Sequence, residues 1–559
     1  MPIYRLYFPE YKLRGYERHL AVLEVEQAFG KTPLTDQRTC LEVVTPFEIP
    51  NGRLECLTFF EKIEILQDAH VHTIVPRQVA LDKSAKISRS PRTRSQVEKL
   101  CADLKSVQNG RREHGYLTHS LHQYKGKFYP QVVKALMNFA LVQDGDVILD
   151  PFGGSGTTML ECYLNNLVGI SVDLNPLASF IAKTKVEVLN LDSLRLEQAV
   201  DKVAEALMAE STRLGLMDAC MGIGVEQSVK VQAESIWPQL RAFVPYPDYL
   251  ERWFDPVALC KIGLVLKEIL ALPNTRFQNL CKVTLSNLLR DFSCQEPSQL
   301  RIRRRKDEAP SYRLLQRFIG DLNRNATIVY VFQSIKHSCQ IGDVPWFCHC
   351  GDARQLQEIP NRFLQQDKQI DFVVTSPPYA MALPYIDTDR LSLATMAFVG
   401  PAYKSELERQ MIGNREIQPR QRKTLEEEFF NNRHDTSLPN SVKALIERIY
   451  ELNSNSSVGF RRQNMPSLLY KYFSDMKLVF RQVWRVLKPG KLFAVIIGSN
   501  HTYAGGERVE ISTDQLLIDI GESLGFQIVQ RMAMTDQPAY MIHSKNMVQS
   551  ETIFILRKP

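Results

Sequence analysis

Long apolar runs are missing from this 559-residue sequence. No stretch approaches the roughly 18 to 20 consecutive apolar residues that a membrane-spanning helix needs. The opening residues, MPIYRLYFPEYKLRG, also contain no continuous apolar core of a secretion signal. We therefore expect a cytoplasmic protein that does not contact a membrane.

Cysteine pairs at metal-ligand spacing are missing as well. The 11 cysteines include no CxxC pair, so neither a disulfide framework nor a structural zinc site is expected. The nearest approach is Cys348-His349-Cys350, which we interpret as the end of a strand whose residues alternate between two faces. No metal site is predicted.

Charge of one sign does not dominate either. The net charge of +7 and the isoelectric point near 8.7 are mildly basic, which suits a polyanionic partner without requiring one. The length alone suggests two to four domains.

The apolar pattern divides the chain into regions. Residues 1–90 alternate short apolar runs with one helical pattern and predict a small α+β domain, and 91–118 read as a linker that runs into a helix. Strands and helices alternate over 119–190 and over 345–559, which predicts an α/β domain with a largely parallel sheet. Residues 191–344 are mostly helical and are interpreted as an insert.

A glycine-rich turn follows the first strand predicted in the α/β region. The sequence LDPFGGSGTT stands between that strand and a helix beginning near Thr157, the context of a nucleotide-binding turn. No lysine follows the last glycine, which excludes a Walker A loop. Asp150 would repel a pyrophosphate but suits an ammonium group, and Asp173 ends the next strand, where an acid often binds ribose hydroxyls. A ligand with an amino-acid end, a ribose and no phosphate is S-adenosylmethionine (SAM).

A rigid corner ends a later strand. The strand DFVVT, 371–375, runs into Ser376-Pro377-Pro378-Tyr379. The two prolines fix φ and bias Ser376 away from the helical region, so the corner is held before any substrate arrives.

Taken together, these motifs resemble those of the DNA amino-methyltransferases, most closely the cytosine-N4 branch. The family's cofactor motif, D-P-F-x-G-S-G-T, matches Asp150 to Thr157, and its catalytic motif, (D/N/S)-P-P-(Y/F/W), matches SPPY. The segment HSLHQYKGKFYPQ, His119 to Gln131, is similar to the family's segment over the methionine end of the cofactor. The resemblance implies a Rossmann-like class I SAM-dependent methyltransferase fold with a seven-stranded mixed sheet, joined here to the N-terminal α+β domain and the helical insert.

The resemblance also implies a set of cofactor contacts. Gly153, Gly154 and Gly156 are expected to take positive φ and let the backbone approach SAM. Asp352 would accept a hydrogen bond from the adenine amino group, with helix capping as its other interpretation, and the Ala353 N–H would donate. The full predicted set is Lys127, Phe128, Asp150, Pro151, Phe152, Gly153, Gly154, Ser155, Gly156, Thr157, Asp173, Leu174, Asn175, Asp352 and Ala353.

Catalysis would take place at the corner. An exocyclic amine of a base is a poor nucleophile because its lone pair is delocalised into the ring. By the resemblance, Ser376 Oγ and the Pro377 carbonyl would accept its two N–H bonds and direct the lone pair at the methyl group, while Tyr379 would stack on the flipped-out base.

Serine at position 376 is typical of the cytosine-N4 branch, so the expected substrate is cytosine N4 in double-stranded DNA. Adenine N6 is one alternative. A second is guanine N2 of tRNA, because the N-terminal region weakly resembles appended RNA-binding domains. A non-catalytic nucleic-acid-binding module is a third. A cognate restriction endonuclease is a conceivable partner of such an enzyme.

Basic residues of the insert are candidates for phosphate contacts, which position a protein without reading bases. They are Arg301, Arg303, Arg304, Arg305 and Lys306. A solvated loop of like charges is the other interpretation. The amide-rich stretch 411–423 is a second candidate for reading the target.

Overall fold

The structure is a computed structural model of the chain. It describes residues 1–30, 32–68, 70–104, 113–124, 126–217, 225–297, 303–307, 309–358, 370–380, 385–415, 417–431, 438–455, 459–534 and 551–559. Within these ranges, no helix is both long and apolar enough to cross a membrane.

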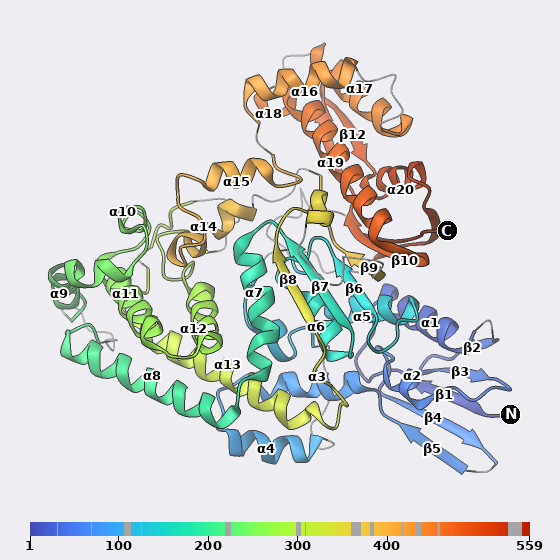
Figure 1. Ribbon diagram of the computed structural model, residues 1–559, viewed down its shortest axis with the longest axis horizontal. Coiled ribbons are helices and arrows are strands. Elements are labelled where there is room, and N and C mark those ends of the chain that lie inside the picture. The colour runs from blue at the N-terminus through green and yellow to red at the C-terminus, as the bar shows by residue number, and fades with distance from the viewer. Residues whose placement is uncertain are drawn as a thin grey trace.

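A seven-stranded sheet lies at the centre of the molecule (Figure 1). Its strands are β6 (Val147–Asp150), β7 (Val168–Asp173), β8 (Trp346–Cys350), β9 (Ile370–Thr375), β10 (Leu487–Gly498), β13 (Gln527–Met534) and β14 (Glu551–Arg557). Their order is β13-β14-β10-β9-β6-β7-β8. β14 runs antiparallel to both of its neighbours, while the pairs from β10 to β8 are parallel. The predicted fold class, a Rossmann-like methyltransferase with a mixed seven-stranded sheet, is confirmed.

The strand order creates a switch point between β6 and β9. From β6 the chain moves outward through β7 to β8, and later returns on the other side of β6 to form β9 and β10. Helices on either side diverge at such a point, so the carboxyl ends of the two strands border a crevice where ligands bind. Asp150 ends β6 and Ser376 follows β9, so the glycine turn and the SPPY corner meet at this edge.

Successive side chains along the central strands point to opposite faces of the sheet. On β9 and β10, Phe372 and Ala494 pack toward α5 (Pro130–Phe139) and the N-terminal unit. Their neighbours Val373 and Val495 pack toward α19 (Met465–Val486) and α20 (Thr513–Ser523). Both faces are therefore covered, which is why these strands read as continuous apolar runs.

The N-terminal unit is a five-stranded antiparallel sheet in the order β2-β3-β1-β4-β5. Its elements are β1 (Ile3–Tyr7), α1 (Gly15–Phe29), β2 (Leu34–Asp36), β3 (Cys40–Val44), α2 (Asn51–Glu55), β4 (Lys62–Gln67) and β5 (His70–Ile74). Glu24 of α1 is buried and accepts hydrogen bonds from Thr58 Oγ1 at 2.6 Å and from Asn138 Nδ2 of α5 at 2.5 Å. The unit is thus bound to the methyltransferase sheet through shared core and buried polar contacts.

The stretch predicted as a linker, 91–118, contains helix α4 (Arg94–Ala102) after α3 (Arg77–Ile87). A capping box starts α4, because Thr93 Oγ1 accepts from the Gln96 N–H and Gln96 Oε1 accepts from the Thr93 N–H. Both helices pack on α13 (Leu314–Lys336). The T-x-x-Q pattern was present in the sequence and indicates this helix start.

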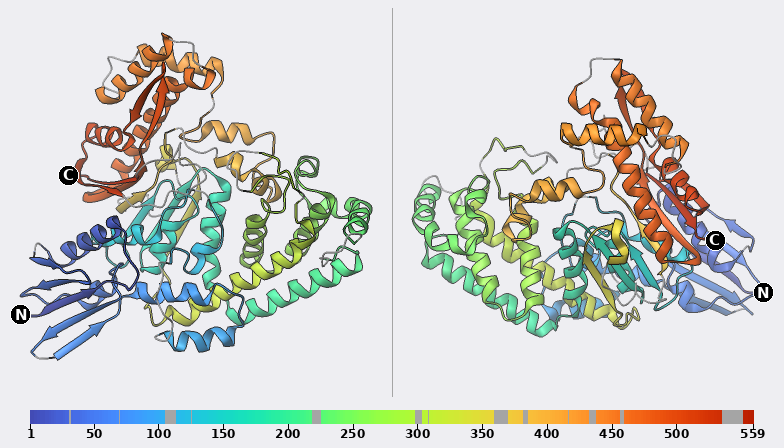
Figure 2. Two further views of the ribbon diagram at one scale, coloured as in Figure 1. Left: turned by 180° about the vertical axis from the view of Figure 1, so that it is seen from behind. Right: turned by 45° about the horizontal axis from the view of Figure 1, so that its top comes forward.

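Helices α6 (Thr157–Leu164) and α7 (Pro176–Glu187) follow the first two central strands. The insert between α7 and β8 is helical. It consists of α8 (Ser193–Arg213), α9 (Val225–Leu240), α10 (Pro247–Leu250), α11 (Pro256–Ala271), α12 (Thr275–Leu288) and α13 (Leu314–Lys336). Figure 2 shows this helical body on one side of the sheet, with the N-terminal sheet on the other side.

A second group of helices follows the SPPY corner. It comprises α14 (Tyr385–Thr395), α15 (Lys404–Gln410), α16 (Pro419–Asn431), α17 (Asn440–Ser454) and α18 (Phe460–Gln463). The hairpin of β11 (Asn500–Ala504) and β12 (Glu507–Ile511) packs against α17. In Figure 1, α16, α17, α18 and the hairpin lie around α19 at the top, whereas α14 and α15 lie between the helical insert and the sheet.

Candidate functional site

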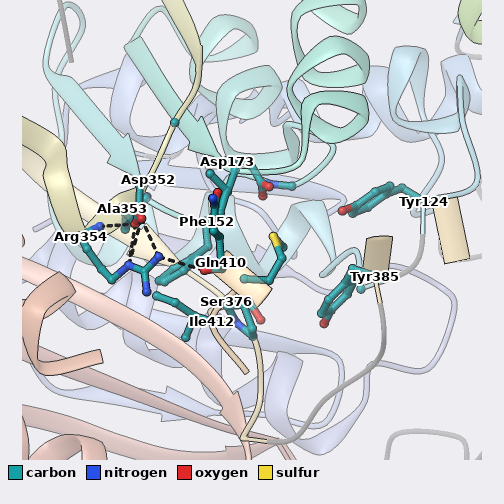
Figure 3. A pocket seen from close by; sticks show the side chains of 17 residues that line it. Tyr124, Phe152, Asp173, Asp352, Ala353, Arg354, Ser376, Tyr385, Gln410 and Ile412 are labelled. Carbon is teal, nitrogen blue, oxygen red and sulfur yellow. Dashed lines mark hydrogen bonds and ion pairs between the residues drawn. The ribbon is translucent and has the colours of Figure 1, made fainter. Parts of the chain in front are cut away.

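A pocket lies at the carboxyl edge of β6, β7, β8 and β9 (Figure 3). The predicted site residues that line it are Pro151, Phe152, Gly154, Asp173, Leu174, Asp352, Ala353, Ser376 and Pro378. Lining residues outside the predicted cofactor and catalytic sets are Tyr124, Gly126, Gly351, Arg354, Tyr385, Gln410, Met411 and Ile412, of which Met411 and Ile412 belong to the stretch predicted as a candidate for reading the target. The glycine turn and the SPPY corner therefore contribute to one pocket.

Asp173 occupies the pocket at the end of β7. Its carboxylate accepts hydrogen bonds from the Gly154 N–H at 2.9 Å and from the Asn175 N–H at 2.8 Å. Burial raises the pKa of Asp173 to about 6, although these two backbone bonds oppose the rise. One bond falls on each oxygen, so each oxygen keeps acceptor capacity for a donor in the pocket.

The glycines of the turn have separate roles. Gly154 has φ +50° and lines the pocket, as expected for a close backbone approach. Gly156 also has positive φ, at +77°, but a Cβ there would lie 2.7 Å from the Ala182 backbone of α7. Gly153 does not have positive φ, and a Cβ there would lie 1.9 Å from Ser171 Oγ of β7. The expectation of positive φ at Gly153 is thus wrong. The absence of a side chain at Gly153 and Gly156 permits close packing inside the protein.

Asp150 lies beneath the pocket, not in its lining. It is fully buried and accepts from Thr158 Oγ1 and Thr375 Oγ1, each at 2.6 Å, and from the Phe152 N–H at 3.1 Å. Burial raises the pKa of Asp150 to about 6. In this structure Asp150 joins β6, α6 and β9, so its contacts hold the turn and do not point to an ammonium group.

Asp352 and Arg354 lie at one end of the pocket. Asp352 accepts from the Arg354 backbone N–H at 2.9 Å, which caps the short 3-10 helix Ala353–Glu358, and from the Arg354 guanidinium at 2.6 Å. The guanidinium also donates to Asp475 of α19 and to the Gln410 carbonyl, each at 2.9 Å. Arg354 therefore ties three segments of the pocket together.

Two tyrosines form the opposite end of the pocket (Figure 3). Tyr124 lies in the segment predicted to cover the methionine end of SAM, and Tyr385 begins α14 after the corner. A Cβ on Gly126 would lie 3.1 Å from the Tyr385 ring, so the two segments touch. Asn175 connects them further by donating to Tyr124 at 3.4 Å and to Asp389 of α14 at 2.8 Å.

The remaining predicted cofactor residues lie outside the lining. Lys127 Nζ donates to the His119 carbonyl at 2.5 Å, and burial lowers the pKa of Lys127 to about 8. Phe128 packs in the core shared with the N-terminal unit. Ser155 Oγ accepts from the buried Lys185 at 3.2 Å, and Thr157 is buried at the first turn of α6. Ser155 and Thr157 thus support the turn from behind, whereas Lys127 and Phe128 support the segment before α5.

The SPPY corner is fixed by hydrogen bonds to its later carbonyls. Tyr472 of α19 donates to the Pro378 carbonyl at 3.0 Å, and Asn500 donates to the Ala380 carbonyl at 2.9 Å. No described residue donates to the Pro377 carbonyl. Ser376 lines the pocket directly before it. The corner thus presents an acceptor pair at the pocket.

Tyr379 lies outside the pocket lining and is bound through its hydroxyl. The hydroxyl donates to Glu551 Oε1 at the start of β14. Burial, the charge of Glu551 and its hydrogen bond raise the pKa of Tyr379, whereas a hydrogen bond from Ser376 opposes the rise. No pattern around Glu551 in the sequence pointed to this contact.

The basic run of the insert is only partly described, because Arg301 lies outside the described residues. Arg304 donates to the Arg252 carbonyl at 2.7 Å, and Arg305 donates to the Asp291 carbonyl at 2.8 Å. Arg303, Arg304 and Lys306 are exposed, whereas Arg305 is partly buried. Arg304 and Arg305 therefore help to hold the insert together. Only the exposed cations of the run remain candidates for phosphate contacts.

The fold and the pocket define a Rossmann-like methyltransferase. No family model matches the chain. Over 425 residues, which are 74% of this chain and 79% of the relative, it is 24% identical to Type II methyltransferase M.BsoBI of Geobacillus stearothermophilus. It is 38% identical over 77 residues, 14% of each chain, to Type II methyltransferase M.MjaII of Methanocaldococcus jannaschii. It is 29% identical over 161 residues to Type II methyltransferase M.AvaI of Nostoc sp., covering 28% of this chain and 31% of the relative.

These similarities support the DNA methyltransferase family, although the matches span only 14% and 31% of the M.MjaII and M.AvaI lengths. Among solved structures, the crystal structure of TrmN from Thermus thermophilus matches over 100% of both chains, with 10% identity and a TM-score of 0.29. A score this low carries no argument, so the fold class here rests on the sheet itself.

The residues of the pocket fit SAM by the chemistry of their groups. Asp173 offers carboxylate oxygens for two ribose hydroxyls, and the Phe152 and Ile412 side chains offer apolar surface for an adenine ring. Gly154 leaves the backbone open at the turn. The Asp352 carboxylate is already paired with Arg354, so only its remaining lone pairs could accept a hydrogen bond from a ligand.

Proposed function

We propose that this protein is a SAM-dependent DNA methyltransferase that methylates the exocyclic N4 amine of cytosine in a flipped-out base. The observation that carries the proposal is the single pocket in which Asp173 and Ser376 lie together. One side suits a nucleoside with no phosphate, and the other side presents hydrogen-bond acceptors for an amine. The similarity to Type II methyltransferases supports the same class.

The corner would activate the amine without an ionised base. The Pro377 carbonyl accepts no bond from the described residues, and Ser376 Oγ lies at the pocket wall. Two acceptors at a fixed angle would hold both N–H bonds of the amine and direct its lone pair toward the cofactor. SAM, when bound, would supply an electrophilic methyl group. The bonds from Tyr472 and Asn500 hold the acceptors in place beforehand.

The cofactor would lie between the two ends of the pocket. We expect its adenine near Asp352, Ala353 and Ile412, its ribose on Asp173, and its methionine end toward the tyrosine pair. This placement brings the methyl group toward Ser376, because Ser376 lines the same pocket as these groups. Thus the cofactor half and the substrate half would meet at the switch point of the sheet.

Serine at position 376 is the basis for proposing cytosine. Its hydroxyl is neutral, as is typical of the cytosine-N4 branch that the motifs resemble. Adenine N6 in DNA and guanine N2 in tRNA are the competing substrates, and each leaves a different modified nucleoside. The exposed cations Arg303 and Lys306 would contact phosphates of a bound duplex.

The test is to express the protein in a host whose DNA lacks methylated exocyclic amines, and to digest both DNA and tRNA for mass spectrometry. We expect 4-methylcytosine in the DNA. In Ser376→Ala we expect that base to disappear while SAM binding, measured by titration, persists. If 6-methyladenine or methylguanosine in tRNA appears instead, the cytosine proposal is wrong.

A further inference from the structure

Helix α12 of the insert contacts the pocket side of the molecule as well as the other insert helices. It packs against α7 and against α14, the helix that begins with Tyr385. Two consecutive residues near its end, Ser286 and Asn287, also bind the segment that carries Tyr124. The insert therefore reaches the segments of both pocket tyrosines, which lie at the end of the pocket away from Asp352 (Figure 3).

The segment of Tyr124 is held at the two residues directly before the tyrosine. His122 Nε2 lies 3.1 Å from Ser286 Oγ, and the Gln123 N–H donates to Asn287 Oδ1 at 2.8 Å. The Tyr124 N–H in turn donates to the His122 carbonyl at 3.1 Å. Because both preceding residues are fixed to α12, the place of the Tyr124 ring is set by the insert.

Ser286 joins this segment to α14. Its Oγ donates to Ser392 Oγ at 2.9 Å, and Ser392 Oγ donates back to the Ser286 carbonyl at 3.3 Å. A serine hydroxyl has one proton, so Ser286 Oγ is the acceptor at His122 and the His122 Nε2 carries the hydrogen. The hydrogen bonds therefore run from the Tyr124 segment through the insert to α14.

A second contact attaches α14 to the insert. The buried Arg390 places its guanidinium carbon 4.0 Å from the centroid of the Trp253 ring, which is within the range of a cation–π contact. Trp253 lies between α10 and α11 of the insert. The helix that begins with Tyr385 is thus bound to the insert at Arg390 and at Ser392.

The two tyrosines close one end of the pocket beside the glycine turn. A Cβ on Gly154 would lie 3.5 Å from the Tyr124 ring, and a Cβ on Gly126 would lie 3.1 Å from the Tyr385 ring. If the adenine of SAM lies near Asp352, this is the end that receives the amino-acid part of SAM. A displaced Tyr124 ring would therefore weaken contacts to the amino-acid part and leave those to the nucleoside part unchanged.

We propose that Asn287 of the insert is a positioning residue for the cofactor, acting through Tyr124 on the amino-acid part of SAM. The inference rests on the proposed function, because it takes SAM as the ligand of the pocket. It gives the insert a part in cofactor binding, in addition to the phosphate contacts proposed for its exposed cations. Neither sequence motif contains Asn287.

The experiment compares two ligands by isothermal titration calorimetry with the full-length protein. SAM contains the amino-acid part, whereas methylthioadenosine has the adenine, the ribose and the sulfur without it. Asn287→Leu removes the acceptor of the Gln123 N–H at similar volume, and Asn287→Asp keeps an acceptor. Asn323→Leu is the matched control, because Asn323 is also half-buried in the insert and its amide donates to the Ile319 carbonyl within α13. Thermal unfolding is measured for every variant.

We expect Asn287→Leu to weaken SAM binding about fivefold, the approximate worth of one neutral hydrogen bond. Binding of methylthioadenosine should not change, because the nucleoside part lies toward the other end of the pocket. Asn287→Asp and Asn323→Leu should bind SAM as the wild type does. Ser286→Ala breaks the neighbouring bond to His122, so it should also weaken SAM binding and leave methylthioadenosine binding unchanged.

Three results would overturn the inference. The first is wild-type SAM affinity in Asn287→Leu. The second is an equal loss of affinity for both ligands, since Asn287 would then support the whole pocket. The third is SAM binding as weak in Asn287→Asp as in Asn287→Leu, since the lost acceptor would then not be the cause.

The same experiment separates this inference from the proposed function. If Asn287→Leu does not fold, the affinities of Ser286→Ala for the two ligands decide in its place. A wild-type protein that binds no SAM would refute the proposed function and the inference with it. A wild type that binds SAM, with variants that bind both ligands equally well, would refute the inference alone.

Discussion

Asp173 is the residue on which cofactor affinity should depend most. Both of its oxygens are already oriented by backbone N–H groups of Gly154 and Asn175. In Asp173→Asn the negative charge is lost, and the new amide NH2 must face one of those N–H donors. Hydrogen bonds to a charged group are worth about 1.5–3 kcal/mol each. We therefore expect a loss of about 2–3 kcal/mol in SAM binding, or roughly 30- to 150-fold in Kd.

The same carboxylate predicts a pH dependence. Burial raises the pKa of Asp173 to about 6, so the protonated form becomes dominant below that pH and cannot accept from two ribose hydroxyls as well as the carboxylate can. SAM affinity should therefore rise as pH increases through 6, with Kd at pH 5 about tenfold weaker than at pH 7.5. In Asp173→Asn this pH dependence should be absent.

Isothermal titration calorimetry with SAM at several pH values measures both effects. Asp248→Asn is the matched control, because that side chain is 84% exposed and pairs with Arg241 at the surface of the insert. Equal affinity of wild type and Asp173→Asn at pH 7.5 would refute the assignment of Asp173 to the cofactor. A second refuting result would be a partly unfolded Asp173→Asn variant whose folded molecules bind SAM with wild-type affinity.

Three further outcomes are expected. Gly156→Ala should lower the free energy of unfolding by about 3 kcal/mol, because φ is +77° and the added methyl group would lie 2.7 Å from the α7 backbone. The control Gly490→Ala, at φ +76° but with open space around the methyl group, should lower it by only about 1 kcal/mol. Urea unfolding measures both free energies. Arg354→Met should weaken SAM binding and cost about 1–3 kcal/mol of stability, measured by titration and thermal unfolding, since Asp352 loses its ion-pair partner and Asp475 keeps only Lys471. Burial raises the pKa of Asp150 from 3.8 to about 6, so the stability contribution of its neutral form is complete below pH 3.8 and is lost as pH rises through 6. Between pH 4.5 and 7.5 the wild type should therefore lose about 2 kcal/mol more than Asp150→Asn; equal losses would contradict the buried position of Asp150.

The central strands were largely predictable from sequence because both faces of the sheet are covered. Cys348-His349-Cys350, predicted as the end of a strand, ends β8, and the strand ahead of the SPPY corner was predicted to within one residue of β9. The hairpin of β11 and β12 was missed, although Gly505 and Gly506, both with positive φ, mark its turn. Its strands are short and lie outside the main sheet, so their apolar pattern is weak.

The candidate site was predictable where one motif lies on one strand end. Asp173 is the last residue of β7 and Ser376 directly follows β9, and both line the pocket. The other walls come from loops whose facing depends on tertiary packing. In the segment before α5, Lys127 was selected, but Tyr124 faces the pocket. No local pattern distinguishes the two, because loop residues have no fixed period.

Arg354 illustrates a different kind of miss. It stands two residues after the selected Asp352, yet its role depends on Asp475, which is more than a hundred residues away in sequence. Glu551 is similar, since its partner Tyr379 is 172 positions earlier. Contacts between such distant segments are set by strand order, which the sequence motifs alone do not reveal.

The central claim is that the protein transfers methyl groups to an exocyclic amine of DNA at the SPPY corner. It is tested most directly by mass spectrometry of nucleosides from a modification-free host that expresses either the wild type or Ser376→Ala. The account predicts 4-methylcytosine in DNA from the first host and none from the second. DNA without any methylated exocyclic amine, together with newly methylated tRNA, would contradict it.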